Sequence, residues 1–111
     1  MSKSQQLHTN AMKIAQEAHF ARENGDLDNY LKLTKLAFEQ EKEAAWALFY
    51  PFDAEPTRSV LFRSAAWLAY HCGEWREAER MVAAGLLGDP PLEIIRELRA
   101  LYKRIVIYLE D

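Results

Sequence analysis

The sequence predicts an all-α protein of about five helices, paired as antiparallel hairpins that stack on one another. Apolar residues recur at intervals of three and four along most of the 111 residues, which is the period of one helix face. Four glycines and four prolines interrupt this pattern at a few places and divide the chain into long stretches. Before residue 104 no stretch alternates apolar and polar residues as a strand would.

The first two helices are predicted on either side of Gly25. The first should run from about residue 5 to residue 24, where Gly25 ends it because glycine adopts the left-handed backbone conformation freely. Asp26 then offers a side-chain acceptor that can cap the next helix. That second helix should run from Leu27 to Leu48, and together the two helices form a hairpin over about residues 5–49.

Prolines and glycines also bound the later helices. Pro51 and Pro56 remove amide donors and favour extended backbone before them, so we expect a loop between residues 50 and 56. Gly73 and Gly88 end the two helices that follow, which gives a second hairpin over about residues 56–88. A closing helix is expected over about residues 91–109, since its apolar face continues through the β-branched run at residues 105–107.

The composition fits a single domain over residues 1–111, of which 50% are apolar. Cys72 is the only cysteine, so an intramolecular disulfide is impossible. A net charge of -3 argues against a general polyanion binder, and we expect no nucleic-acid partner. The N-terminus is polar and no apolar run approaches the roughly 20 residues that cross a bilayer, so we expect a cytoplasmic protein with no membrane partner.

Large and small residues occupy characteristic positions through the second hairpin. The order is Phe62, Ala65, Ala66, Ala69, Gly73, Trp75, Ala78, Val82, Gly85 and Pro90. This spacing resembles the tetratricopeptide repeat. The stretch from residue 55 to residue 91 is also similar to a group of small bacterial proteins of this kind, and this second resemblance implies no particular activity. The first hairpin keeps much of the pattern, but Tyr30 stands where the small Ala78 stands in the second. The resemblance covers residues 11–91, although the turn glycines lie 48 residues apart and not 34.

The resemblance implies a fold and a function: a short stack of hairpins in which the first helix of each pair lines a groove that binds a peptide or a helix. In this chain the implied partner-binding residues are Arg63, Trp67, Tyr70, His71, His19, Arg22 and Glu23. Trp, Tyr and Arg are also the residues that most often dominate the binding energy of interfaces. The competing interpretation is that Trp67 and Tyr70 pack against the fifth helix as core.

Chemistry-bearing residues form no catalytic or metal-binding pattern in the sequence, and we expect no cofactor. The three histidines are not spaced as metal ligands with each other or with Cys72. Glu39, Glu41 and Glu43 are expected on a solvated helix face beside Lys35 and Lys42. The resulting hypothesis is a non-catalytic protein-interaction module, with a homodimer formed through the aromatic face, or a small enzyme, as alternatives. The basic residues of the last helix are expected on a solvated outer face.

The repeat pattern makes a first testable prediction, because Ala66 and Ala78 should face each other across the second hairpin. An Ala66→Leu or Ala78→Leu change should overpack this contact and lower the free energy of unfolding by about 1–3 kcal/mol. Urea denaturation measures this free energy, with Ala100→Leu on the polar side of the last helix as the control. If either substitution changes the free energy of unfolding no more than the control substitution does, the predicted hairpin packing is wrong.

Overall fold

The computed structural model describes residues 2–110 and contains five helices in chain order. Their bounds agree with the prediction within about two residues, and the segment at residues 105–109 is helical. No strand occurs within the described residues, so the predicted all-α class is confirmed. The helices are α1 (Lys3–Glu23), α2 (Leu27–Ala47), α3 (Thr57–His71), α4 (Trp75–Leu87) and α5 (Leu92–Leu109).

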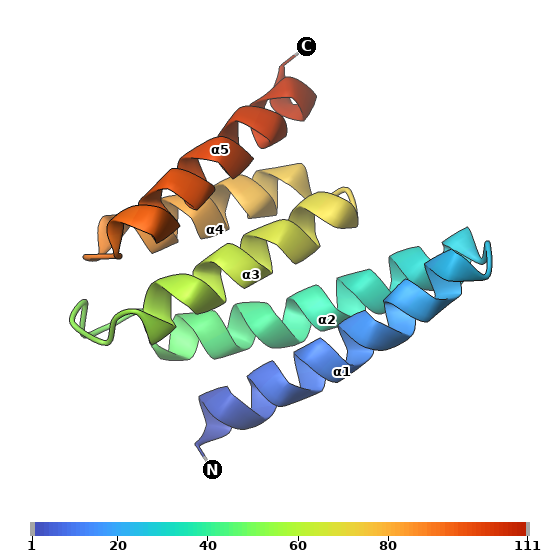
Figure 1. Cartoon of the computed structure of the whole chain (residues 1–111), viewed down its shortest axis with the longest axis horizontal. Coiled ribbons are helices and arrows are strands. Elements are labelled where there is room, and N and C mark those ends of the chain that lie inside the picture. The colour runs from blue at the N-terminus through green and yellow to red at the C-terminus, as the bar shows by residue number, and fades with distance from the viewer. Residues whose placement is uncertain (1, 111) are drawn as a thin grey trace.

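Each helix packs against the next one along the chain, and α5 also contacts α3. Figure 1 shows the five helices crossing the molecule in order from α1 to α5, with the two termini at opposite edges. The molecule measures 41 × 41 × 19 Å, and its thickness is about two helix diameters. Both broad faces of such a flat body expose helix surface to solvent.

Buried alanines let the central helices approach closely. Ala66 of α3 and Ala78 of α4 are both fully buried, as the sequence pattern requires. The larger side chains of the same core are Phe38, Leu61, Phe62, Met81, Val82, Ile94, Leu98, Leu101 and Ile105. Most of them come from α3, α4 and α5, so the core is centred on the second half of the chain.

Two turns of the same kind connect α1 to α2 and α3 to α4. Gly25 and Gly73 have φ angles of 75° and 81°, which residues with a Cβ rarely adopt. In each turn the amide three residues beyond the last helical residue donates back to the carbonyl of the fifth residue before it: Asp26 N to Ala21 O, and Glu74 N to Ala69 O, both at 2.9 Å. This is the Schellman arrangement, which satisfies carbonyls at a helix end.

Arg58 is the largest fully buried side chain, although it belongs to the first turn of α3. Its Nε donates to the carbonyl oxygen of Phe49 at 2.8 Å. Its two terminal nitrogens donate to carbonyl oxygens in the last turn of α4, Nη2 to Ala84 at 2.5 Å and Nη1 to Gly85 at 3.2 Å. One guanidinium therefore connects the end of α2, the start of α3 and the end of α4.

Aromatic rings and one carboxylate surround this guanidinium. The rings of Phe49, Phe52 and Phe62 have their centroids 5.0 to 5.1 Å from Cζ of Arg58, within cation–π range. Glu55 lies 3.6 Å from Nη1, so the buried cation has a counter-charge. A Cβ on Gly88 would lie 2.6 Å from Nη1, which explains why a residue without a side chain follows α4.

Glu55 extends the same network to two further backbone groups. Its carboxylate accepts from the amide of Ser59, near the N-terminus of α3, at 3.0 Å. It also accepts from the amide of Asp89, between α4 and α5, at 3.1 Å. The acidic side chain thus caps α3 and fixes the loop that leads into α5.

Replacing Arg58 by Met should be strongly destabilising, because the new side chain keeps much of the volume but leaves three carbonyl groups without their donor. Each buried group left unpaired costs about 1–3 kcal/mol, so we expect a loss of about 3 kcal/mol or more in the free energy of unfolding. Urea denaturation followed by circular dichroism gives the value. The exposed Arg96→Met change serves as the control and should stay within about 0.5 kcal/mol. A loss below about 1 kcal/mol for Arg58→Met would show that Arg58 does not hold the helices together.

Candidate functional site

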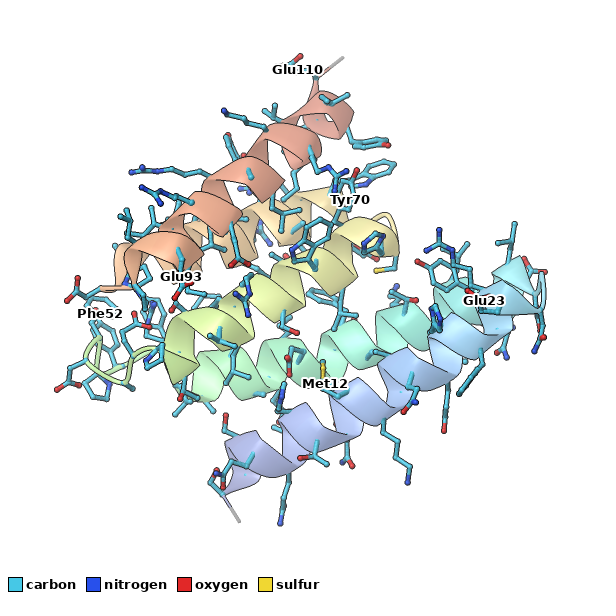
Figure 2. The ribbon with its side chains drawn as sticks, in the orientation of Figure 1. Met12, Glu23, Phe52, Tyr70, Glu93 and Glu110 are labelled. Atoms are coloured by element: carbon cyan, nitrogen blue, oxygen red, sulfur yellow. The ribbon has the colours of Figure 1, made fainter. Side chains whose placement is uncertain are left out.

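The structure brings together the four residues predicted on α3, which we call the α3 face: Arg63, Trp67, Tyr70 and His71. The indole of Trp67 stacks on the imidazole of His71, with ring centroids 5.3 Å apart and planes 18° apart. Trp67 and Tyr70 are both half-buried and meet edge to face at 5.9 Å. Figure 2 shows Tyr70 where α3 approaches α5.

Helix α5 contacts three members of the α3 face. Arg63 donates to Oε2 of Glu97 at 2.9 Å. The guanidinium of Arg104 lies 5.5 Å from the centre of the Trp67 ring, and the ring of Tyr108 lies 5.8 Å from that of Tyr70. Trp67 and Tyr70 also pack against the core cluster. These groups already have partners within the chain, as the competing interpretation of Trp67 and Tyr70 expected.

The residues predicted on α1 lie near its exposed C-terminal end. His19 and Glu23 approach each other at 3.5 Å one turn apart, and the guanidinium of Arg22 covers the half-buried ring of Tyr30 at 5.7 Å. Arg22 is the member of this group whose charge acts on a residue of the α3 face, His71. Partial burial lowers the pKa of His71, and the charges of Arg22 and Arg104 lower it further. His71 therefore favours its neutral form between two arginines.

An apolar hollow that the sequence pattern did not predict lies along α4. This α4 groove has a volume of about 970 Å³. Helix α4 supplies most of the lining, the end of α2 and the residues after it supply two aromatic rings, and α5 supplies one wall. The lining residues are Trp46, Phe49, Arg76, Glu79, Arg80, Val82, Ala83, Ala84, Leu86, Leu87, Arg99, Tyr102 and Lys103.

The signal that could have revealed the α4 groove is the width of the apolar stripe on α4. Val82 and Ala84 are buried, as a core stripe requires. Ala83 and Leu87, four residues apart, continue the apolar surface on the exposed side, where Leu87 is 59% exposed. An apolar stripe wider than the core can cover indicates a second contact surface.

Basic side chains form the rim of the α4 groove. Arg76 donates to Glu79 at 2.7 Å. Arg80 donates to Glu77 at 2.8 Å, so these two cations are paired along α4. A hydrogen bond from Lys42, together with Arg80, holds the pKa of Glu77 below its ordinary value.

The cations that α5 contributes to the rim are not paired as those of α4 are. Within residues 2–110 neither Arg99 nor Lys103 forms an ion pair. Both side chains line the groove, one turn apart on the same helix. Tyr102, between them in sequence, donates its hydroxyl to Oε2 of Glu79 at 3.4 Å. The α5 wall therefore presents two positive charges and an aromatic ring to the groove.

The prediction that Glu41 lies on a solvated helix face is wrong, because its side chain is fully buried. Nδ1 of His8, on α1, lies 2.9 Å from both carboxyl oxygens of Glu41, on α2. Burial raises the pKa of Glu41, although hydrogen bonds from Ser64 and His8 oppose the increase. Nearby, the hydroxyl of Ser4 donates to the carbonyl of Ala44 at 2.8 Å. This polar cluster joins the first helix to the second and third.

Cys72 and the acidic residues offer little nucleophilic or metal chemistry. Burial raises the pKa of the Cys72 thiol, which donates to the carbonyl of Ala69 at 3.5 Å. A thiol held in this protonated form is a poor nucleophile. Among residues 2–110 no three His, Cys, Asp or Glu side chains gather as a metal site. Within the same residues, no helix combines the length and apolar character needed to span a bilayer.

No protein-family model, curated protein or solved structure matches this chain. Over the described residues the fold and its surfaces define an all-α protein with an aromatic face on α3 that contacts α5 and an open apolar groove along α4. The sequence pattern predicted that the residues of the α3 face share one helix face, whereas the α4 groove is lined by three separate segments of the chain, at residues 46–49, 76–87 and 99–103.

The buried Glu41 makes a prediction about pH. Because its pKa in the folded protein lies above the ordinary 4.5, the folded state holds this proton more tightly than the unfolded chain does. The contribution of Glu41 to stability should therefore fall as the pH rises from 4.5 through the raised value. A Glu41→Gln variant lacks this titration, so its stability relative to the wild type should improve as the pH rises.

Urea denaturation at pH 4, 5.5 and 7 measures this difference in the free energy of unfolding. A His8→Leu variant is the companion control. It removes one of the groups that lower the pKa of Glu41, so the loss of stability should extend to higher pH. A difference between Glu41→Gln and wild type that stays constant, or changes in the opposite direction, would contradict a raised pKa.

Proposed function

We propose that this protein is a non-catalytic protein-interaction module that holds a helical segment of another protein in the α4 groove. The observation that carries the proposal is the apolar groove itself, with a volume of about 970 Å³ and three aromatic rings, Trp46, Phe49 and Tyr102, in its lining. Trp46 is 41% exposed and Tyr102 is 39% exposed, so both can still gain contacts. Exposed aromatic and apolar groups around a groove are typical of sites that bind an amphipathic helix.

The length of the groove favours a helix over a compact small molecule. Its lining residues on α4 extend from Arg76 to Leu87, which is about three helical turns or roughly 16 Å. Positions 83 and 87 lie on the exposed side of successive turns. A partner helix laid along α4 would contact this row continuously, whereas a compact ligand would cover only part of it.

The proposed module is a short stack of helical hairpins of the tetratricopeptide kind, but its groove runs along α4, the second helix of a pair, and not along the first helices as the resemblance implies. The two Schellman turns at Gly25 and Gly73 support this interpretation, because they repeat the same backbone geometry at equivalent points of the sequence pattern. Helix α5, which packs on both α3 and α4, would then cover the open end of the stack.

A homodimer is the second candidate function, and the end of α5 favours it. Ile107 is 68% exposed, and Tyr108, 50% exposed, stacks on Trp75 with ring centroids 4.4 Å apart. Tyr108 also lies beside Tyr70, so the apolar surface at the end of α5 continues into the α3 face. A second copy could bury these rings without any other partner.

A photo-crosslinking amino acid placed at single positions tests the proposed function. Ala83 is exposed in the middle of the groove, and a probe there should crosslink to one defined protein in extracts of the source cell. The matched control is the exposed Gln16 on α1, where the same probe should capture nothing specific. A third probe at Trp67 examines the α3 face.

The pattern of crosslinks decides between the candidates. Capture from Ala83 alone supports the module as proposed. A crosslink of the chain to itself from Trp67 supports the homodimer, and capture of a different protein from Trp67 alone places the interaction on the α3 face. Capture equal to the Gln16 control at both positions contradicts the proposed function.

A further inference from the structure

We infer that the α4 groove binds an acidic amphipathic helix, one whose apolar stripe is flanked by glutamate or aspartate side chains. The inference rests on the proposed function and adds the chemistry of the partner. It follows from the charges on the two sides of the groove and from their different states of pairing.

The wall formed by α5 supplies the recognition. Arg99 and Lys103 lie four residues apart on one helix, so their backbone positions are about one helical turn, roughly 6 Å, apart along α5. Two carboxylates four residues apart on a partner helix that lies in the groove, between α4 and the α5 wall, would have the same spacing. Within residues 2–110 no carboxylate pairs with Arg99 or Lys103, so both can form new ion pairs without breaking existing ones.

The α4 side strengthens the same preference. Arg76 and Arg80 also line the groove, and their partners Glu79 and Glu77 belong to α4 itself. Four cations and one carboxylate, Glu79, therefore line the groove, although the whole chain has a net charge of -3. This local excess of positive charge in an acidic protein repels basic segments and attracts acidic ones.

A second copy of this chain fits the groove poorly. Most homodimers form by two-fold symmetry, which places the same surface of each subunit against the other. Across the α4 groove that contact would bring the positively charged rims of the two copies together, and like charges at an interface repel each other. Nucleic acid fits poorly as well, because the apolar floor formed by Val82, Ala83 and Leu86 offers no contact to phosphate.

Two matched synthetic peptides test the inference with the full chain. Both have 18 residues with capped ends and a leucine stripe at helical spacing, flanked in one by glutamate and in the other by lysine. Fluorescence anisotropy should show that the glutamate peptide binds about tenfold tighter at 50 mM salt, and that 500 mM salt removes most of the difference.

Charge reversal identifies the surface. The double variant Arg99→Glu/Lys103→Glu should lose about tenfold in affinity for the glutamate peptide and gain affinity for the lysine peptide. The matched control is Lys13→Glu/Lys32→Glu, which makes the same change in net charge at exposed positions on α1 and α2 and should bind as the wild type does. Equal losses in the two double variants would show that net charge, and not the groove wall, attracts the peptide, which overturns the inference.

Other outcomes separate this inference from the proposed function. If both peptides bind equally and Ala83→Trp weakens both, the groove binds helices without selecting acidic ones, so the inference fails and the proposed function stands. If neither peptide binds, or a short single-stranded RNA displaces the glutamate peptide, the inference fails, and the crosslink from Ala83 then decides the proposed function alone. Light scattering during the titration reports self-association, and a dimer lost in Ala83→Trp would also overturn the inference.

Discussion

The buried guanidinium of Arg58 is the interaction on which the arrangement of α2, α3 and α4 depends. It is fully buried and donates to the carbonyl groups of Phe49, in the loop that follows α2, and of Ala84 and Gly85, in the last turn of α4. Carbonyls in the last turn of a helix lack partners within that helix, and a cation there also interacts favourably with the helix dipole. A single side chain thus supplies donors to the last turn of α4 and connects it to the loop that follows α2.

This interaction also shapes the surface that we propose as functional. Phe49 and Ala84 accept hydrogen bonds from Arg58 and also line the α4 groove. The position of α4 relative to the loop after α2 is therefore fixed from inside the protein by the same residues that line the groove. The cost of burying a cation is offset by three hydrogen bonds, three aromatic rings and the nearby Glu55.

Much of the fold could be predicted from the sequence, because local rules determine it. Gly25 and Gly73 adopt the left-handed backbone that ends α1 and α3, and the alanines at helical spacing are buried as expected. The roles of Arg58 and Glu41 could not be predicted in this way. Each is a charged residue in a helix, which ordinarily faces solvent, and only partners distant in the sequence explain its burial. Glu41 pairs with His8 on another helix, and Arg58 reaches residues 26 and 27 positions away.

The candidate site was predictable only in part, for the same reason. The spacing of Trp67, Tyr70 and His71 correctly placed them on one face of α3. It could not show that Arg104 and Tyr108 of α5 would cover that face. The α4 groove was missed because its lining comes from three helices, and no single stretch of sequence contains it.

Hydrogen–deuterium exchange of an Arg58→Lys variant, compared with the wild type, tests the central role of Arg58 most directly. Lysine keeps the positive charge but has a single compact ammonium, which cannot bridge the ends of two helices as the guanidinium does. Under conditions where the variant remains folded, we expect faster exchange in the last turn of α4 and in residues 49–56. Exchange in the first three turns of α1, which Arg58 does not contact, should stay unchanged. Equal exchange in the two proteins at the end of α4, or an increase spread evenly over all five helices, would contradict the account.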